Sequence, residues 1–125
     1  MNWDIYNALA ANPVIKEKVN VNTQIKFYKY PATGDFSGCY IIIDPITTPS
    51  PNSFGGNKWI TKRYLYQIEV WSSSLTDRDL VAEAIEKVLW DSLEFRQSGD
   101  GLDEYDEGLK IYRDARRYRG VKHVI

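Results

Sequence analysis

Hydrophobic and polar residues alternate along the segment "YLYQIEVW", residues 64–71. Successive side chains of a β-strand point to opposite faces, so a period of two predicts a half-buried strand. We place this strand over residues 59–71. Its first face carries Tyr64, Tyr66, Ile68 and Val70, and its second carries Leu65, Gln67, Glu69 and Trp71.

The hydrophobic period then changes to that of a helix. Apolar residues recur every three or four positions at Leu80, Val81, Ala84, Ile85, Val88, Leu89 and Leu93. This stripe predicts a long amphipathic helix. Thr76 is the expected N-cap, with Asp77 and Asp79 in the first turn and a hydrophobic staple between Leu75 and Leu80. Replacing that cap with alanine would then cost about 1 kcal/mol.

Two shorter helices are predicted near the N-terminus. Helical spacing after Asn2, the expected N-cap, indicates a helix over residues 3–11. Asn12 and Pro13 then end this helix and start a second short one, because proline is tolerated at the first helical position and asparagine caps it. The apolar residues of the first helix are Trp3, Ile5, Tyr6, Leu9 and Ala10.

Two more strands are indicated before residue 46. The stretch "NTQIKFYKYPA", residues 22–32, is rich in β-formers and ends at Pro31. The run "GCYIIIDP", residues 38–45, is apolar and β-branched and has the pattern of a central strand. With 125 residues the chain has the length of one domain, so we expect residues 1–125 to form a single domain.

A long loop is expected over residues 44–58, because the segment "DPITTPSPNSFGGNK" is rich in proline, glycine, serine and threonine. This composition predicts neither a ladder nor a helix. Loops of this length are usually functional or disordered. The segment is therefore either a flexible connection or an arm that becomes ordered against a partner through two apolar anchors, Phe54 and Trp59.

The last quarter of the chain is divided by charge. Residues 100–107 contain five acidic and no basic residues, whereas residues 110–122 contain six basic and one acidic residue. A hairpin that pairs the two segments explains this pattern, because opposite charges across a ladder are favourable. Alternatively the basic segment binds a partner. We expect its far end, with Arg116, Arg117, Arg119 and Lys122, to extend past the acidic strand and face another surface.

Composition limits the class of protein. A net charge of -1 excludes a globally basic nucleic-acid binder, and an aromatic share of 14% suits a packed core with contact surfaces. The single cysteine, Cys39, cannot form an intramolecular disulfide, which favours a cytosolic origin. Neither a secretory signal nor a membrane span is predicted, since no stretch approaches 18 apolar residues.

No catalytic chemistry is indicated. The only histidine, His123, lies near the C-terminus, and Cys39 precedes an apolar strand without a basic activator, so we expect a solvated imidazole and an inert buried thiol. Metal spacing and phosphate-binding motifs are missing, and no carboxylate lies within an apolar run that would raise its pKa. We therefore expect a non-enzyme with no cofactor and no bound metal.

Three features together resemble the small tail-terminator, or tail-completion, proteins of long-tailed bacteriophages and prophages. They are the strand "YQIEVWS", the helix "LVAEAIEKVLW" that follows it, and the ending "DEYDEGLKIYRDARRYRG". The resemblance covers most of the chain in element order. It implies an α+β fold in which a small mixed, mainly antiparallel sheet packs against an N-terminal helix and one long amphipathic helix.

The resemblance also implies a function. Such a protein forms a ring, usually a hexamer, that caps the finished tail tube and completes the head-tail joining interface. The partners would be other copies of the chain, the tail tube protein and the head-tail connector proteins, in a virion tail assembled in the bacterial cytoplasm. Residues 44–58 would order at subunit contacts. The candidate interface residues are Phe54, Trp59, Arg113, Arg116, Arg117, Tyr118, Arg119 and Lys122.

The alternative is a small nucleic-acid-binding protein. The C-terminal segment interleaves basic residues with Tyr112 and Tyr118, and stacking aromatics beside phosphate-binding cations are what this role requires. The overall charge of -1 and the shortness of the cluster argue against it.

Overall fold

The structure is a computed structural model that describes residues 1–28, 30, 38–55 and 58–123, with the backbone only at residues 54 and 58–60. Its helices are α1 (Asn2–Ala10), α2 (Pro13–Lys18) and α3 (Leu75–Leu93). Its strands are β1 (Ile25–Phe27), β2 (Cys39–Pro45), β3 (Ser50–Gly55), β4 (Lys58–Ser72), β5 (Arg96–Gln97), β6 (Leu102–Asp106) and β7 (Ile111–His123).

All these strands belong to one mixed sheet in the described part of the chain. The order is β1-β2-β4-β7-β5, with β3 added to β4 and β6 added to β7. Only β1 and β2 pair in parallel, and the other pairs are antiparallel. The predicted α+β fold, with a mainly antiparallel sheet packed against helices, is confirmed.

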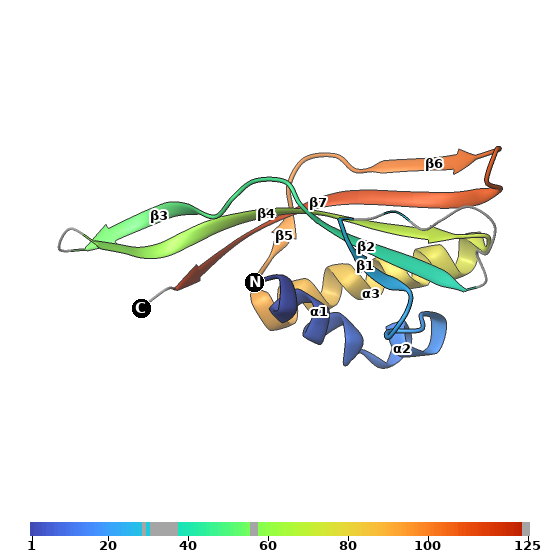
Figure 1. The fold of residues 1–125 in the computed structure, drawn as a ribbon, viewed down its shortest axis with the longest axis horizontal. Coiled ribbons are helices and arrows are strands. Elements are labelled where there is room, and N and C mark those ends of the chain that lie inside the picture. The colour runs from blue at the N-terminus through green and yellow to red at the C-terminus, as the bar shows by residue number, and fades with distance from the viewer. Residues whose placement is uncertain (29, 31–37, 56–57, 124–125) are drawn as a thin grey trace.

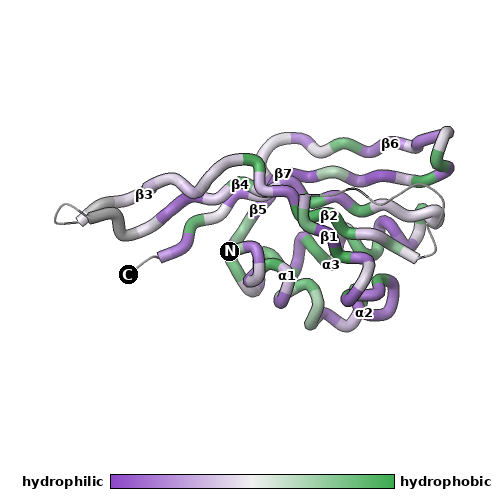
Figure 2. The backbone as a smooth tube through the Cα atoms, in the orientation of Figure 1, coloured by the Kyte–Doolittle hydropathy of each residue, from purple (hydrophilic) through white to green (hydrophobic). Residues whose placement is uncertain are grey.

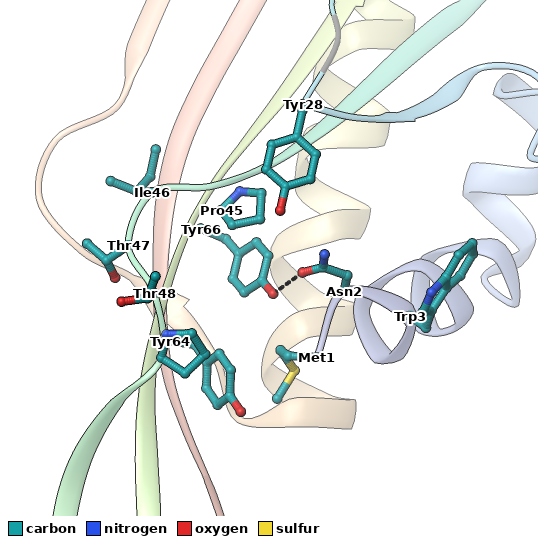
Figure 3. A pocket seen from close by; sticks show the side chains of 11 residues that line it. Met1, Asn2, Trp3, Tyr28, Pro45, Ile46, Thr47, Thr48, Tyr64 and Tyr66 are labelled. Carbon is teal, nitrogen blue, oxygen red and sulfur yellow. Dashed lines mark hydrogen bonds between the residues drawn. The ribbon is translucent and has the colours of Figure 1, made fainter.

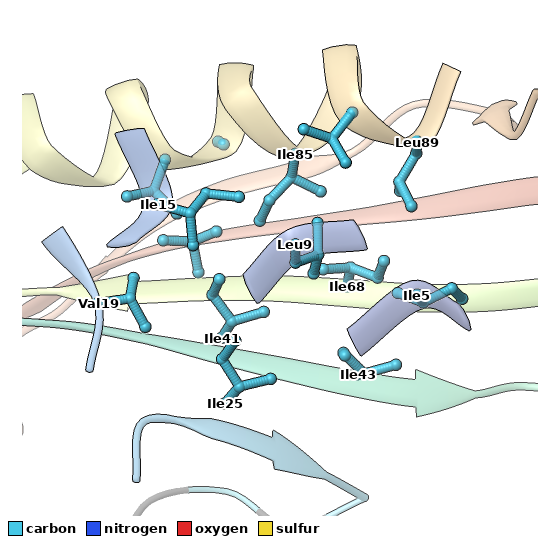
Figure 4. Close-up of a cluster of buried hydrophobic side chains, with 14 of the residues drawn as sticks. Ile5, Leu9, Ile15, Val19, Ile25, Ile41, Ile43, Ile68, Ile85 and Leu89 are labelled. Carbon is cyan, nitrogen blue, oxygen red and sulfur yellow. The ribbon is translucent and has the colours of Figure 1, made fainter. Parts of the chain in front are cut away.

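The three helices cover one face of this sheet (Figure 1). The first predicted face of β4 turns toward them, and Ile68 packs in the core with Ile41 from β2, Ile85 from α3 and Leu9 from α1 (Figure 4). Figure 2 shows hydrophobic segments gathering where β2 lies over α3. At about 25 cal/mol per Å² of apolar surface, burying such side chains is the main stabilising term of the fold.

The other face of the sheet has a smaller apolar cluster. Ile42, Trp71 and Ile111 are buried there, with Tyr40 and Leu109 packed against them. No helix covers this face among the described residues (Figure 1). We call it the open face.

The expectation that residues 44–58 carry no ladder is wrong. Residues 50–55 form β3, which pairs with β4 from Lys58 to Arg63. Pro51 is tolerated because β3 is an edge strand, and the register shifts after it, as proline and bulges allow. Together with residues 121–123 of β7, this ribbon projects beyond the helices (Figure 1). We call residues 50–55 and 58–63 the β3–β4 arm.

The start of α3 differs from the expectation by two residues. Ser74, not Thr76, is the N-cap, and its Oγ accepts a hydrogen bond of 3.3 Å from the Asp77 backbone N–H. Helix position N4 is then Arg78, so the predicted staple between Leu75 and Leu80 does not form, and both leucines are exposed. A serine three residues before an acidic residue is a local signal of a helix start, but no capping box forms here, because the Ser74 backbone N–H donates to Ser72 Oγ and not to Asp77.

The N-terminal helices are close to their predicted ranges. Asn12 caps α2 as expected, with its Oδ1 accepting from the backbone N–H groups of Val14 and Ile15. Asn2 is not a cap, because it lies inside α1 and its side chain accepts a hydrogen bond from the Tyr66 hydroxyl instead.

Candidate functional site

The hairpin predicted between the acidic and basic segments is present. Strand β6 pairs with the first five residues of β7, and Glu104 lies opposite Arg113. Their side chains form an ion pair of 2.6 Å. The same register, however, sets Asp103 opposite Asp114. Two like charges directly across a ladder are unfavourable unless other groups neutralise them.

Two arginines neutralise this aspartate pair. Arg78, only 3% exposed, extends from α3 to within 2.5 Å of Asp103. Arg116 binds Asp114 at 3.0 Å and also Glu86 of α3 at 3.0 Å. Burial raises the pKa of Asp114, and the Arg116 guanidinium offsets only part of that effect. Asp114 does not lie within an apolar run of the sequence, so its raised pKa follows from burial in the tertiary structure.

A second charged group is buried beneath the open face. The Glu69 carboxylate is 0% exposed and accepts four hydrogen bonds, from Arg113 Nε, Trp71 Nε1, Gln67 Nε2 and the Tyr30 hydroxyl. Burial alone would raise the pKa of Glu69, but these donors together outweigh it and hold that pKa below its usual value. Glu69 is thus an ionised structural group.

Several predicted interface residues serve the fold instead. Arg113 binds Glu69, Arg116 binds Asp114, and Lys122 holds α1 through a 2.8 Å ion pair with Asp4. Arg116 and Lys122 do extend past the acidic strand, which pairs only with residues 111–115. That they face another surface stays a prediction. The tyrosine in the predicted set, residue 118, is only 1% exposed and lies in the core, so it is not an interface residue of the folded chain. Its burial raises its pKa to about 12.

The remaining predicted residues are placed as follows. Arg117 is exposed, and its Nε donates to Gln67 Oε1 at 3.2 Å. Arg119 is exposed on β7. Phe54 and Trp59 are backbone partners near the outer end of the β3–β4 arm, and their side chains lie outside the described part of the structure.

Arg119 belongs to a cleft of about 490 Å³ at the base of the arm. Arg63 of β4 and Arg96 of β5 line the same cleft, together with Trp90, 54% exposed, and Glu94 from the end of α3. Among the residues that the structure describes, none of the three guanidinium groups makes an ion pair or a hydrogen bond. Arg96 and Arg119 are direct partners across the β5–β7 ladder. We call this site the arginine cleft.

An aromatic groove of about 600 Å³ lies between the start of α1 and the segment joining β2 to β3 (Figure 3). The Tyr66 hydroxyl donates to Asn2 Oδ1 at its floor. Two of its aromatic side chains are strongly exposed, Trp3 at 66% and Tyr28 at 60%. Other lining residues are Met1, Pro45, Ile46, Thr47, Thr48, Pro49 and Tyr64.

The groups considered for chemistry are placed apart. Cys39 is a buried thiol, as expected, and burial raises its pKa. His123 is exposed and pairs with Thr61 at the end of β7. In the described ranges no three His, Cys, Asp or Glu side chains are arranged to hold a metal ion. None of the helices described is long and apolar enough to cross a membrane.

Sequence reasoning missed the residues that the structure brings together. Arg63 was on the predicted strand, but its neighbours in space come from β5 and from the end of α3. Arg96 is in a two-residue strand too short for a periodic signal. Glu69 was assigned to the same strand face as two of its donors, Gln67 and Trp71, but the pattern contained no sign of the other two, Arg113 and Tyr30.

The fold has a counterpart among solved structures. A chain of a structure titled "Virion of native gene transfer agent (GTA) particle" superposes with a TM-score of 0.61 at 16% sequence identity. The match covers 95% of this chain and 91% of that chain. At this identity the likeness shows a shared fold. No protein-family model matches the chain, and no curated protein matches its sequence.

Proposed function

We propose that this protein is a structural component of a phage or phage-derived particle, in which it caps the tail tube as a ring and completes the head-tail joining interface. One observation carries the proposal. The fold matches a chain of a virion structure over nearly the full length of both chains. Independently, the sequence pattern resembles that of tail-terminator proteins. This resemblance implies an α+β fold, and the structure has an α+β fold.

The surface of the molecule supports assembly with itself. A ring of identical subunits needs two different, complementary patches on each subunit and a rigid frame that sets the angle between neighbours. The β3–β4 arm projects from one end of the long axis, and the β6–β7 hairpin lies at the other end (Figure 1). The capped helix α3, packed against β4 and β7 between these ends, provides the frame.

The proposed partners are further copies of this chain in a hexameric ring, the tail tube protein and the head-tail connector proteins. The tail would be assembled in the cytoplasm of a bacterial host. The aromatic groove, with Trp3 and Tyr28 exposed, and the arm, whose sequence includes Phe54 and Trp59, are proposed contact surfaces for these partners, because aromatic residues are enriched at protein interfaces. No catalytic step is part of the proposed role.

The nucleic-acid-binding alternative has less support. Arg113, Arg116 and Lys122 already bind carboxylates of the same chain, and Tyr118 is buried where it cannot stack on a base. Binding to phosphate would require these ion pairs to break. The remaining exposed arginines are few, and the net charge is -1.

The proposal is tested by measuring assembly directly. The purified protein, alone and with purified tail tubes, is examined by native mass spectrometry and by electron microscopy. We expect rings, hexameric by the resemblance, at one end of the tubes. Particles lacking the protein should have tails of irregular length or tails that fail to join heads. A stable monomer that never binds tubes would contradict the proposal.

A further inference from the structure

The arginine cleft has positive charge that the chain itself does not neutralise. Arg63, Arg96 and Arg119 meet there with one carboxylate, Glu94, that bonds to none of them. Arg96 and Arg119 are directly opposite each other in the ladder, an arrangement that costs free energy by like-charge repulsion. An anionic group bound between them would remove this cost, and guanidinium groups bind carboxylates through paired hydrogen bonds.

Unneutralised negative charge lies on the β6–β7 hairpin. Asp103 and Glu104 are bound to arginines. Asp106 caps the turn through a hydrogen bond from the Leu109 backbone N–H, and its carboxylate has no cationic partner among the described residues. Asp100 and Glu107 are exposed, and no described side chain bonds to them.

These two surfaces cannot meet within one molecule. Strand β7 runs from the hairpin at Ile111 to the cleft at Arg119, and at about 3.4 Å per residue these positions are about 27 Å apart. Figure 1 shows the β6–β7 turn and the end of α3 at opposite ends of the helical layer. Contact between cleft and hairpin therefore needs two copies.

We propose that the arginine cleft binds the acidic β6–β7 turn of a neighbouring copy, which arranges subunits head to tail. This inference rests on the proposed function, in which copies form a ring. It identifies the cleft as one side of the subunit contact and the turn, with Asp106 and Glu107 at its start, as the other. Trp90 is the aromatic residue of the cleft, and tryptophan and arginine are both enriched among interface hot spots.

Charge complementarity favours a second copy over nucleic acid. One chain carries both halves of the contact, the cleft and the turn, and repetition of a single heterologous contact generates a ring when its rotation closes. A nucleic acid in the cleft would neutralise the arginines and leave the acidic turn of every subunit without a partner.

A charge exchange tests the contact. Arg119→Glu and Glu107→Lys should each weaken self-association at least about tenfold, measured by analytical ultracentrifugation, because like charges then face each other. The variant with both substitutions should regain most of the affinity, since the two charges are swapped across the same interface. Lys16→Glu and Glu83→Lys are matched controls on exposed helix positions and should leave association unchanged.

A second measurement does not depend on the stability of the ring. Glu107→Cys and Arg119→Cys proteins are mixed under mild oxidation, and we expect disulfide-linked heterodimers well above the amount formed by either protein alone.

Failure of the inference and failure of the proposed function are distinguishable. Rings that form equally well in all variants would overturn the cleft-to-turn contact and leave the ring proposal standing. A wild-type chain that forms no ring and binds no tube would overturn both. Loss of salt-dependent DNA binding in Arg119→Glu, with self-association unchanged, would assign the cleft to nucleic acid and overturn the inference.

Discussion

Glu69 is the residue whose role in the structure is most specific. Its carboxylate accepts hydrogen bonds from side chains of β4, of β7 and of the segment before β2, so it joins elements that are distant in sequence. A buried charge is costly unless it is paired and hydrogen-bonded, and here both conditions are met. The network orients Arg113 between Glu69 and Glu104. It therefore connects the core of the sheet with the acidic hairpin.

Removing this charge should destabilise the fold. Glu69→Gln keeps the shape but leaves Arg113 with an uncharged partner in a buried site, and we expect a loss of about 2 kcal/mol in the free energy of unfolding. Urea denaturation of the two proteins measures this loss in the free energy of unfolding. The exposed control Glu83→Gln should change the free energy by less than about 0.5 kcal/mol. An equal effect of the two substitutions would contradict the role assigned to Glu69.

The stability difference between wild type and Glu69→Gln should also depend on pH. The pKa of Glu69 is lowered in the folded state, so its ionised form stabilises the fold. This contribution is full at pH values above the ordinary carboxyl pKa of 4.5 and is lost as the pH falls through the lower folded value. Urea titrations at a series of pH values from neutral downward measure the difference. A gap that stays constant into strong acid would contradict this assignment.

At the scale of elements, the junction between β4 and α3 determines where the long helix begins. Ser72 Oγ accepts from the Ser74 backbone N–H at 3.0 Å, and Ser74 then caps the helix. The helix packs its buried face, including Ile85 and Leu89, on the sheet. Ser72, the last residue of β4, and Ser74 thus fix how the strand enters the helix, which makes the junction rigid for a geometric reason.

The position of the N-cap of α3 is tested by comparing two alanine variants. Ser74→Ala should lower the free energy of unfolding by about 1 kcal/mol, because a backbone N–H at the helix start loses its acceptor. Thr76→Ala, at an exposed position inside the helix, should cost clearly less. Thermal and urea unfolding of the two variants decide between Ser74 and Thr76. A larger loss for Thr76→Ala would restore the cap expected from the sequence.

Strand β7 packs tightly against Phe95, the second residue after α3. A Cβ atom on Gly120 would lie 1.9 Å from the ring of Phe95, which is itself 1% exposed. Gly120→Ala should therefore destabilise the fold by about 2 kcal/mol through overpacking. Gly108→Ala, in the β6–β7 turn, is the control and should cost less, since its nearest contact is 3.3 Å from an aspartate side chain. Equal urea midpoints for the two variants would show that Phe95 moves aside freely.

At the scale of the whole molecule, the two faces of the sheet have different roles. The face under the helices stabilises the chain, whereas the arm, the open face and the two charged ends are left for contacts (Figure 1). The ends have opposite charge and are too far apart to meet in one chain. In the proposed assembly these ends would meet head to tail, and a contact of this kind forms a ring when its rotation closes.

If the proposed subunit contact is electrostatic, association should weaken with salt. The Debye length falls from about 10 Å at 0.1 M ionic strength to about 3 Å at 1 M. We expect the association constant from analytical ultracentrifugation to fall over this range in wild type. The charge-swapped variant Arg119→Glu with Glu107→Lys should show a similar salt dependence. Association that is unaffected by salt would indicate an apolar contact, with the aromatic groove as its first candidate.

Local patterns were sufficient to predict much of the fold. The alternation at Ile68 and Val70, the stripe at Ile85 and Leu89, and the pair Asn12 and Pro13 depend on neighbours in sequence, and the structure agrees with each. The prediction for residues 50–55 failed because an edge strand tolerates proline. That property depends on which neighbours a strand has in the sheet. The organisation of residues 1–125 as a single domain stays a prediction.

The candidate site was less predictable. Arg113, Arg116 and Lys122 form a basic run in sequence, but their charges are used in ion pairs with residues as distant as Asp4. Arg63 and Arg96 had no signal in the sequence, because isolated arginines are ordinary surface residues. Only Arg119 was identified from the sequence and is also in the cleft.

The sequence by itself determined the order and type of the main helices and strands and the charged hairpin, because hydrophobic period, proline and like-charge runs act over a few residues. The tertiary structure alone decided which charges are neutralised and which are left exposed. That outcome depends on strand register and on the crossing of α3 over the sheet, which bring together side chains far apart in the chain. The arginine cleft, and thus the proposed contact between subunits, arises only from the tertiary structure.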